Sequence, residues 1–473
     1  MVKEYDLVVL GGGTGGYVGA IRAAQLGMTV AIVEKEKLGG TCLHKGCIPS
    51  KALLKSAEMY RQVKHVDQFG VQVSDLSFDF TQMQERKEEN VNTLHQGIQA
   101  LMKKNKIDVY EGEGAVLAAS IFSPIPGTVS VKLHDEADNL MLNPKQLLIS
   151  TGSSPKALKG LPFDGEKIIH SDHILQLTEL PESIIIVGGG VIGIEWASLL
   201  TDLDVKVTVV EGSQSILPTE DRDVQVYVKK QLEKRGVSFY TNVDLSEGDI
   251  DVDDEVTMTM VQNEETIDLS AEKMLVSIGR SPNIEQIGLS NTSIEYDQHG
   301  IKTNEYYQTE ESHIYAIGDC IGGMQLAHVA SKEAIIAVEH MNEENPNVLL
   351  EEHVPTCVYS YPEISKIGLT EAEVKKAGYQ YVTSKFPYQA IGKSHVNGDT
   401  NGFCKVIIDK ETDDLLGIHL VGENATDLIG EASLAKLLDA SGWELTQTIH
   451  AHPSLSEVFS EAVLASKNKP IHL

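Results

Sequence analysis

The sequence predicts an α/β fold with two Rossmann-like units, followed by a C-terminal α+β domain. Three observations lead to this prediction. A glycine-rich turn, Gly-x-Gly-x-x-Gly, occurs twice, each time between a short apolar run and a helix-like stretch. The two copies begin at Gly11 and Gly188, so the unit recurs after 188 − 11 = 177 residues, too long for a solenoid repeat. After about residue 350 no such turn recurs, and short strands precede a helix.

Length and charge narrow the class of protein. The chain has 473 residues, more than one hydrophobic core accommodates, so several domains are expected. Its hydrophobic content of 41% and charged content of 23% are typical of a soluble globular protein. The net charge of 39 − 69 = −30 argues against nucleic acid as a partner. An acidic surface would suit a basic protein partner, although simple solubility is the plainer explanation.

The first unit has the full context of a dinucleotide-binding fingerprint. Residues 6–10 are expected to form a buried strand, 17–27 a helix and 29–33 a second strand. Glu34 ends that strand, 34 − 11 = 23 residues after the first glycine, where an acid can accept the ribose hydroxyls. The glycines let the backbone approach a pyrophosphate at the helix N-terminus. They are Gly11, Gly13 and Gly16.

The second unit repeats the pattern with the same spacing. A strand is expected at 184–187, then a glycine turn that opens a helix, then a strand at 205–210 that ends in Glu211. The glycines are Gly188, Gly190 and Gly193. Glu211 would bind a 2′-hydroxyl and repel a 2′-phosphate, and no Lys or Arg follows it until Arg222. The second site is therefore predicted to prefer NAD to NADP.

Two cysteines five residues apart follow the first unit directly. Cys42 and Cys47 could form a disulfide that opens and closes, or could be ordinary core thiols. Residues i and i+5 of a regular helix lie beyond the roughly 7 Å Cα limit for a disulfide. Cys42 must therefore precede the helix, or the first turn must be distorted, which Pro49 supports. Five cysteines, an odd number, suit a reducing compartment with one catalytic pair.

Near the C-terminus, His452 and Glu457 form a candidate acid–base pair. A histidine oriented by a carboxylate is an arrangement typical of a general base, but Glu457 could equally cap the helix after Pro453. His450 adds a second imidazole, yet the set is poor for zinc because no Cys or second close acid completes it. No metal site is predicted.

The remaining elements are expected as follows. Residues 52–104 are expected to be helical and residues 107–150 rich in strands, and a short strand near 313–317 leads to Asp319. An Asp at such a position can bind ribose or polyol hydroxyls, or can be a plain N-cap. The C-terminal strands are expected near 354–360, 380–387, 403–409 and 415–421, with a helix near 424–440.

Five motifs in order resemble those of the flavin-dependent pyridine nucleotide–disulfide reductases. They are the first dinucleotide unit, CLHKGCIPSK at 42–51, the second unit with Glu211, AIGD at 316–319 and HAHPSLSE at 450–457. The likeness covers the whole chain. It is strongest to the members that oxidise protein-bound dihydrolipoamide with NAD+ for the 2-oxo acid dehydrogenase complexes.

The resemblance implies FAD and NAD as cofactors and assigns residues to three sites. The catalytic residues would be Cys42, Cys47, His452 and Glu457. FAD would contact Gly11, Gly13, Gly16, Glu34, Lys51, Gly114, Asp319 and Ala327. The NAD site would comprise Gly188, Gly190, Gly193, Glu195, Glu211, Val243 and Gly279, with Glu195 also pairing with Lys51.

The resemblance also implies the domain order and the assembly. The FAD-binding domain would span residues 1–150 and resume at 277–350, around an NAD-binding domain at 151–276. Residues 351–473 would form an interface domain of a homodimer, in which His452 acts on the disulfide of the partner. The dimer would bind the dihydrolipoyl domain and the basic peripheral subunit-binding domain of an acyltransferase core.

Two other functions stay open at this point. A glutathione-reductase-like enzyme would share the core, but such enzymes mostly use NADPH, against which Glu211 argues. A purely acidic docking subunit would not explain two nucleotide sites. The sequence predicts no signal peptide, and a cytoplasmic protein is therefore expected. No appended lipoyl domain is expected either. Thr14 and His44-Lys45 depart from the usual family residues, and both positions are expected to face no required chemistry.

Overall fold

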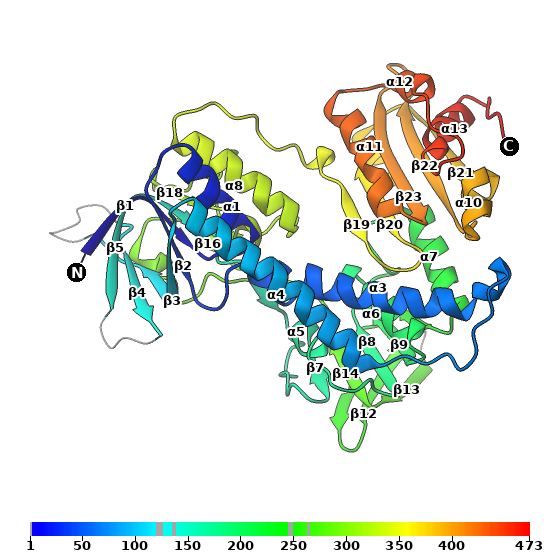
Figure 1. Cartoon of the computed structure of the whole chain (residues 1–473), viewed down its shortest axis with the longest axis horizontal. Coiled ribbons are helices and arrows are strands. Elements are labelled where there is room, and N and C mark those ends of the chain that lie inside the picture. Colours follow the sequence, from blue (N-terminus) through cyan, green and yellow to red (C-terminus); the bar gives the residue numbers. More distant parts are fainter. Residues whose placement is uncertain (1, 120–125, 135–138, 245–248, 263–264) are drawn as a thin grey trace. The chain divides into compact units, whose positions relative to one another are not determined.

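The structure is a computed structural model that describes residues 2–119, 126–134, 139–244, 249–262 and 265–473 (Figure 1). The chain forms two compact units, each built from three separate segments. The first unit contains Met1–Ala52, Thr81–Lys156 and Gly279–Leu349, and the second contains Leu53–Phe80, Ala157–Ile278 and Leu350–Leu473. The finer division into domains at residues 150, 276 and 350 stays a prediction.

The first unit is organised around a parallel sheet. In spatial order its strands are β3 (Asp108–Val116), β2 (Val30–Glu34), β1 (Val2–Leu10), β5 (Leu140–Ile149) and β18 (Ile314–Ala316). A further strand, β4 (Val129–Leu133), pairs antiparallel with both β3 and β5. The predicted strands in 107–150 are confirmed where the structure describes them; residues 120–125 and 135–138 lie outside the described part. The first glycine turn thus follows a central strand.

Two helices of the first unit, α1 (Thr14–Gln25) and α8 (Ala327–Met341), lie side by side (Figure 1). The small side chains of Ala20, Ala23, Ala334 and Ala337 are fully buried in the core cluster that both helices share. Alanines at such positions let helix backbones approach closely. The close packing brings the loop that precedes α8 next to the first glycine turn.

One expectation for this region is wrong. Residues 52–104 do not form one helical stretch: α3 (Cys47–Lys64) is followed by the short 3₁₀ turn η1 (Val66–Phe69), and α4 (Phe80–Lys104) starts only after a non-helical segment. Gly70 ends η1 with a φ of 76°, a left-handed conformation that favours glycine.

The second unit contains a second parallel sheet with the same logic. Its order is β10 (Ser238–Thr241), β9 (Lys206–Glu211), β8 (Ser183–Val187), β14 (Lys273–Val276) and β7 (Ile168–Ile169). Strand β8, which precedes the second glycine turn, lies between β9 and β14, just as β1 lies between β2 and β5. Helix α6 (Val191–Asp202) follows the turn. The predicted repeat of the unit is confirmed.

The C-terminal part of the second unit is an antiparallel sheet with helices packed on it. The strand order is β19 (Thr356–Val358), β20 (Ile364–Gly368), β23 (Leu415–Gly422), β22 (Gly402–Asp409) and β21 (Tyr381–Pro387). Side chains of α11 (Ala425–Leu437) and α13 (Glu457–Ser466) share a core with β22 and β23. The predicted α+β character is confirmed, and β20 is a strand that the sequence did not reveal.

The other described elements are shorter connections and small sheets. They are α2 (Gly40–His44), β6 (Ser153–Pro155), α5 (Ser171–Ile174), α7 (Arg222–Lys234), β11 (Asp249–Val252), β12 (Val256–Gln262), β13 (Glu265–Ala271), β15 (Arg280–Pro282), η2 (Leu289–Asn291), β16 (Tyr296–Asp297), β17 (Gly300–Ile301), η3 (Gly318–Ile321), η4 (Glu351–His353), α9 (Glu371–Ala377), η5 (Tyr388–Ala390), α10 (Gly392–Asn397) and α12 (Gly442–Gln447).

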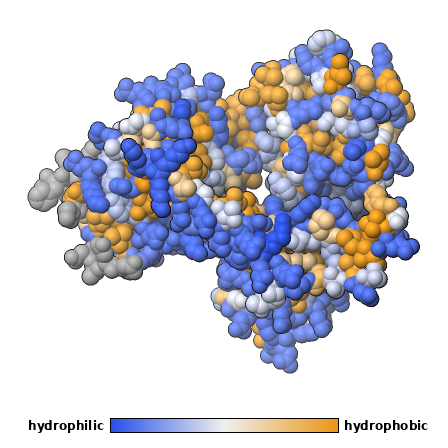
Figure 2. Space-filling model, in the orientation of Figure 1, coloured by the Kyte–Doolittle hydropathy of each residue, from blue (hydrophilic) through white to orange (hydrophobic). Residues whose placement is uncertain are grey.

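An apolar surface lies over α11 and α12, where orange side chains gather in Figure 2. It comprises Leu434, Leu437, Leu438, Trp443 and Ile449, each more than half exposed. Contiguous exposed apolar residues of this size mark interaction surfaces. Among the described helices, none combines the length and the apolar character that a membrane-spanning segment requires.

Candidate active site

The first glycine turn leaves room at the start of α1. Gly13 is the N-cap residue, and no side chain caps the helix. A Cβ at Gly13 would meet only the Cα of Gly40, at 3.9 Å, whereas a Cβ at Gly16 would lie 1.9 Å from the carbonyl oxygen of Gly11. The turn is therefore closed on its inner side and open at the helix N-terminus, as a pyrophosphate requires.

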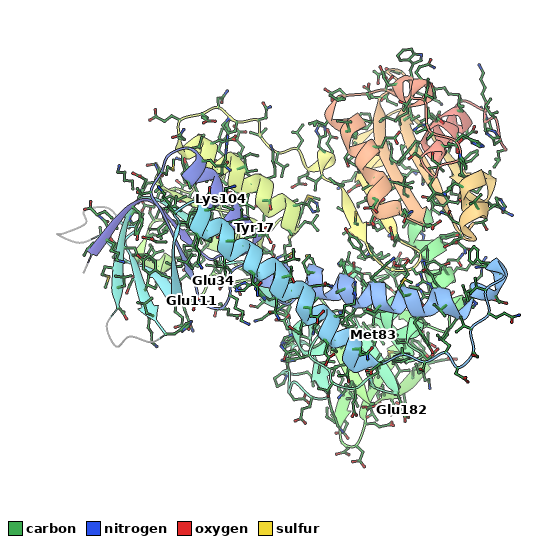
Figure 3. All side chains as sticks on the ribbon, in the orientation of Figure 1. Tyr17, Glu34, Met83, Lys104, Glu111 and Glu182 are labelled. Carbon is green, nitrogen blue, oxygen red and sulfur yellow. The ribbon has the colours of Figure 1, made fainter. Side chains whose placement is uncertain are left out.

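Glu34 ends β2 beside this turn and is labelled in Figure 3. Its Oε2 accepts the N–H of Gly12 at 2.7 Å and its Oε1 accepts the N–H of Glu36 at 2.8 Å. Burial raises the pKa of Glu34, while these two N–H donors favour its ionised form. The backbone thus holds the carboxylate in the position where an adenosine ribose would reach it.

The second glycine turn reproduces these contacts. Gly190 caps α6 without a side-chain cap, and a Cβ there would meet nothing within 4 Å. At Gly193 a Cβ would lie 1.9 Å from the carbonyl oxygen of Gly188. The carboxylate of Glu211 accepts the N–H of Gly189 and that of Ser213, both at 2.6 Å. The two glycine turns, 177 residues apart, therefore form equivalent candidate binding sites, each with an open helix N-terminus and a carboxylate held by two backbone N–H groups. Each such site is called a cradle below.

Two further residues predicted for the second site follow strands β10 and β14. The N–H of Val243 donates to the carbonyl oxygen of Glu211 at 3.2 Å, so the backbone after β10 is tied to the end of β9. Gly279 follows β14 with a φ of 112°, and a Cβ there would meet nothing within 4 Å. Val243 thus belongs to the same unit as the second turn, whereas Gly279 belongs to the other unit, so its contribution to the NAD site stays a prediction.

The cysteine-bearing stretch packs directly on the first glycine turn. The N–H of Gly39 donates to the carbonyl oxygen of Gly12 at 2.8 Å. A Cβ at Gly40 would lie 2.6 Å from the Cα of Gly13, so only glycine permits this approach. The two glycines bring α2 against the place where the first dinucleotide would bind.

Cys42 and Cys47 lie next to each other on different helices. Cys42 belongs to α2 and Cys47 is the first residue of α3, so the break between the helices satisfies the predicted geometry. Both are free thiols here, and their side chains are hydrogen-bonded to each other. That hydrogen bond and burial raise the pKa of Cys42, while the Thr14 hydroxyl and Lys51 lower it. The two thiols therefore titrate as a coupled pair, and the direct contact with Cys47 disfavours ionisation of Cys42.

The contact between Thr14 and Cys42 overturns one expectation. Thr14 was expected to face no required chemistry, yet its hydroxyl is hydrogen-bonded to the sulfur of Cys42. The other two residues that depart from the family, His44 and Lys45, contact neighbouring residues. His44 Nε2 is hydrogen-bonded to the carbonyl oxygen of Leu38 at 2.9 Å, and Lys45 Nζ pairs with Glu36 Oε2 at 2.5 Å. Only the packing of α2 on α1 reveals the role of Thr14.

Replacing Thr14 by valine removes this hydroxyl with little change in shape. The pKa of Cys42 is expected to rise further, because a donor to its thiolate is lost. A hydrogen bond to a charged group contributes roughly 1.5–3 kcal/mol, so alkylation at Cys42, resolved from that at Cys47 by peptide mass spectrometry, should slow about tenfold or more near neutral pH. The rate of iodoacetamide labelling against pH measures this. The exposed strand variant Thr257→Val is the control, and equal pH profiles for both would contradict the assignment.

Asp319 lies in η3, on a turn that runs from β18 towards α8. Its Oδ2 accepts the hydroxyl of Ser153 at 2.5 Å and lies 3.9 Å from Nε of Arg280. Arg280 in turn donates to the Ser153 hydroxyl at 2.7 Å. Ala327 is the first residue of α8, five residues after Gly322, the C-cap residue of η3. Sequence reasoning named Asp319 and Ala327 but missed Ser153 and Arg280, which carry no motif.

The other predicted residues lie at separate places. Gly114 is in β3, where a Cβ would lie 2.4 Å from Cδ1 of Leu10, so a larger residue there would displace a buried side chain of β1. Lys51 is on α3, one turn after Cys47. Glu195 is buried in α6, and its Oε1 accepts the N–H of Tyr359 at 3.0 Å. Because Lys51 and Glu195 belong to different units, their pairing stays a prediction.

The structure joins His452 and Glu457. His452 Nδ1 lies 2.9 Å from Oε1 of Glu457, whose Oε2 accepts the N–H of Ser454 at 2.9 Å. Partial burial would raise the pKa of Glu457, but these two hydrogen bonds outweigh it and hold the pKa below its ordinary value. The His452 side chain is 76% exposed, so its Nε2 is open to a substrate. Glu457 therefore orients the imidazole, and it is not the cap of α13, whose N-cap residue is Ser456.

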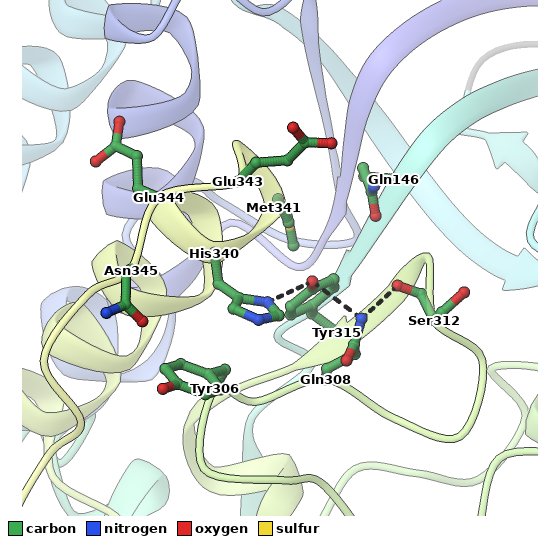
Figure 4. Close-up of a pocket in the computed structure, with 10 residues that line it drawn as sticks. All are labelled: Gln146, Tyr306, Gln308, Ser312, Tyr315, His340, Met341, Glu343, Glu344 and Asn345. Atoms are coloured by element: carbon green, nitrogen blue, oxygen red, sulfur yellow. Dashed lines mark hydrogen bonds between the residues drawn. The ribbon is translucent and has the colours of Figure 1, made fainter.

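A cavity of about 520 Å³ in the first unit lies apart from these residues (Figure 4). The ring of Tyr306 stacks on that of His340, and the His340 Nδ1 bonds the hydroxyl of Tyr315 at 2.8 Å. The described residues that line the cavity include Glu343 and Glu344 but no lysine or arginine. Such a lining disfavours the phosphates of a dinucleotide.

Two family models and a relative of known name match the chain. Residues 5–334 match the family model "Pyridine nucleotide-disulphide oxidoreductase", and residues 354–463 match the dimerisation domain of that family. The "Dihydrolipoyl dehydrogenase" of Bacillus subtilis is 56% identical, over 100% of both chains.

Two solved structures extend the comparison. The chain resembles LpdA from Mycobacterium tuberculosis with a TM-score of 0.89 and 25% identity, over 98% of this chain and 99% of that one. It also resembles the HOCl-induced flavoprotein disulfide reductase RclA from Escherichia coli, with a TM-score of 0.84 and 26% identity, over 97% and 99% of the two chains.

Proposed function

Because the chain belongs to the pyridine nucleotide-disulphide oxidoreductase family, we propose that it oxidises protein-bound dihydrolipoamide to lipoamide and reduces NAD+ to NADH. The observation that carries the proposal is the position of the thiol pair. Cys42 and Cys47 lie together, and their stretch packs on the first glycine turn through Gly39 and Gly40. A redox-active pair next to a dinucleotide cradle suits the relay of electrons between a dithiol and a nicotinamide.

The first unit holds FAD in this proposal. The residues fit the cofactor: the helix N-terminus at Gly13 is open, Glu34 is available to the ribose, and Asp319 presents a carboxylate to polyol hydroxyls. FAD, when bound, supplies the two-electron carrier between the thiol pair and NAD+. The chain contributes orientation and charge.

The second unit holds NAD+ in this proposal. Its turn is open at Gly190, and Glu211 is fixed by two backbone N–H groups, ready to accept a ribose 2′-hydroxyl. A 2′-phosphate would meet the same carboxylate and be repelled. The arrangement supports NAD+ rather than NADP+.

The thiol chemistry follows from the two sulfurs. The enzyme starts with a Cys42–Cys47 disulfide, which a substrate thiolate attacks at Cys42, so that the electron pair of the S–S bond remains on Cys47. The second substrate thiol then attacks the mixed disulfide, the lipoyl S–S bond forms, and Cys42 leaves. One substrate proton passes to the base and the other ends on Cys42. The hydrogen bond from Thr14 stabilises Cys42 as it leaves.

His452 is the base in this proposal, and it acts on the disulfide of a second copy of the chain. Glu457 holds the imidazole through Nδ1, which leaves Nε2 to take the substrate proton. The chain has the dimerisation domain of its family, and we assign the apolar surface on α11 and α12 to the interface of a homodimer.

The partner of the dimer is proposed to be the acyltransferase core of a 2-oxo acid dehydrogenase complex. Its dihydrolipoyl domain would bring the substrate, and its basic peripheral subunit-binding domain would meet an acidic surface, in keeping with a net charge of −30. The compartment is proposed to be the reducing cytoplasm, because five cysteines, an odd number, suit one catalytic pair and no disulfide scaffold.

A steady-state assay tests the proposed function. The purified protein is mixed with dihydrolipoamide and NAD+, and NADH formation is followed by absorbance. We expect turnover in the ordinary enzyme range of about 1–10³ s⁻¹, and much slower turnover with NADP+. Activity only with NADPH and glutathione disulfide would instead identify a glutathione-reductase-like enzyme, and no turnover with any dithiol would favour a docking role.

The variant Glu211→Gln tests the nicotinamide preference. The amide oxygen can accept only one of the two N–H groups that the carboxylate holds, that of Gly189 or that of Ser213, and the charge that repels a 2′-phosphate is gone. The ratio of kcat/KM for NAD+ to that for NADP+ is expected to fall about tenfold or more. Glu34→Gln is the matched control, because it removes the equivalent charge from the first cradle. An unchanged ratio in Glu211→Gln, or an equal fall in Glu34→Gln, would contradict the assignment.

A further inference from the structure

Glu333 is a carboxylate in an apolar place. It lies in the second turn of α8 and is only 7% exposed. Its neighbours on the buried face of the helix include Val329, Ala330, Ala334 and Ala337. A glutamate is almost never buried in such surroundings without a specific partner, because removing a carboxylate from water is costly.

The partner is the turn that carries Asp319. Oε2 of Glu333 accepts the N–H of Gly318 at 2.6 Å. Gly318 has a φ of 69°, and a Cβ there would lie 3.2 Å from the Cβ of Ala330. The turn therefore lies against α8 at a left-handed glycine, and the carboxylate of Glu333 accepts the N–H of that residue.

We propose that Glu333 is a positioning residue for FAD. Its carboxyl group holds the backbone of Gly318, and this fixes the turn that presents the next residue, Asp319, to the cofactor. The inference rests on the proposed use of FAD by the first unit and adds a residue that no motif indicates. Ser153 and Arg280 contact the carboxylate of Asp319 itself. The turn is therefore held both through the Asp319 side chain and through the Gly318 backbone.

The charge of Glu333 depends on pH in the neutral range. Burial raises its pKa from 4.5 to about 7, the N–H of Gly318 opposes this, and the negative charge of Asp319 adds to it. Among the described residues, Asp319 on η3 is the charged group that acts on it, and α8 contributes none. Since the folded-state pKa is raised, the contribution to stability is full below about pH 4.5 and is lost as the pH rises through about 7.

Two variants at Glu333 separate positioning from mere packing. Glu333→Ala leaves the N–H of Gly318 without its partner. The dissociation constant of FAD is therefore expected to rise roughly tenfold to a hundredfold. In Glu333→Gln the amide oxygen accepts the same N–H, so FAD retention is expected to be rescued. The measurement is the rise of flavin fluorescence on dilution of the purified holoenzyme. Glu339→Gln, on the same helix and paired with Arg22, is the control and should match wild type.

A pH profile gives a second readout, which also serves if Glu333→Ala does not fold. Thermal unfolding of the holoenzyme is measured between about pH 5 and pH 8, and Glu333→Gln is expected to gain on wild type as the pH rises, because an amide does not ionise. Equal FAD retention in Glu333→Ala and wild type, or parallel pH profiles, would overturn the inference. A wild-type protein that purifies colourless would instead overturn the proposed function.

Discussion

Replacing Cys42 by serine is expected to abolish oxidation of dihydrolipoamide by NAD+, while the protein stays folded and retains FAD. A serine hydroxyl cannot form the disulfide that the substrate thiolate must open. Cys42 lies on α2 beside Cys47, and serine is nearly isosteric, so the packing of Gly39 and Gly40 on the first glycine turn is kept. NADH formation from dihydrolipoamide and NAD+ is measured in steady state, and the flavin content is read from the absorption spectrum.

A second cysteine supplies the control for this experiment. Cys357 is half-buried in β19, and its Sγ lies 3.9 Å from the carbonyl oxygen of Thr426, remote in sequence from the redox stretch. Cys357→Ser is expected to oxidise dihydrolipoamide like wild type. If Cys42→Ser kept more than about a tenth of the wild-type rate, the thiol pair would not be the electron relay and a docking role would gain ground.

Replacing His452 by glutamine is expected to slow dihydrolipoamide oxidation by roughly 10²–10⁴, the range attributed to general acid–base catalysis. Glutamine keeps a polar side chain near Glu457 but cannot take the proton of a substrate thiol. The rate is expected to recover in part at high pH, where the substrate thiol ionises without a base. Both kcat and its pH dependence are measured with dihydrolipoamide as the varied substrate.

The chain contains a matched control for His452. His472 Nδ1 lies 2.8 Å from Oε1 of Glu461, and the His472 side chain is 65% exposed, so it has the same pairing and a similar exposure near the same helix. His472→Gln is expected to leave the rate unchanged. A rate for His452→Gln within about twofold of wild type would remove His452 from the mechanism.

The fold elements that the sequence predicted correctly are those with strong local signals. A glycine turn between an apolar strand and a helix, with an acid 23 residues on, defines both parallel units without tertiary information. The non-helical segment between α3 and α4 was missed although Gly70, which ends η1 at a φ of 76°, is a local signal for it; one of its packing contacts is remote in sequence. A Cβ at Gly398 would lie 2.6 Å from the ring of Phe69, so a residue more than 300 positions away packs on η1. Local propensity holds no trace of that contact.

The candidate site shows the same division. The residues with a motif, such as Cys42, Glu211 and His452, were predicted, whereas Thr14 and Glu333 were not. Thr14 acts through the packing of α2 on α1, which depends on Gly39 and Gly40. Glu333 did leave a signal, because a glutamate interrupts the apolar face of α8, but its partner Gly318 appears only in the folded chain.

An anaerobic titration of the purified holoenzyme with dihydrolipoamide tests the central claim most directly, since it asks whether substrate electrons reach the thiol pair beside the flavin. The visible spectrum is recorded as two electrons per FAD are added. We expect a new long-wavelength absorption band at that point, because a Cys47 thiolate next to FAD, as proposed, would donate charge to the flavin, and we expect Cys42→Ser to show no such reduction by the substrate. A wild-type spectrum that bleaches without that band, or that does not respond to dihydrolipoamide at all, would contradict the account.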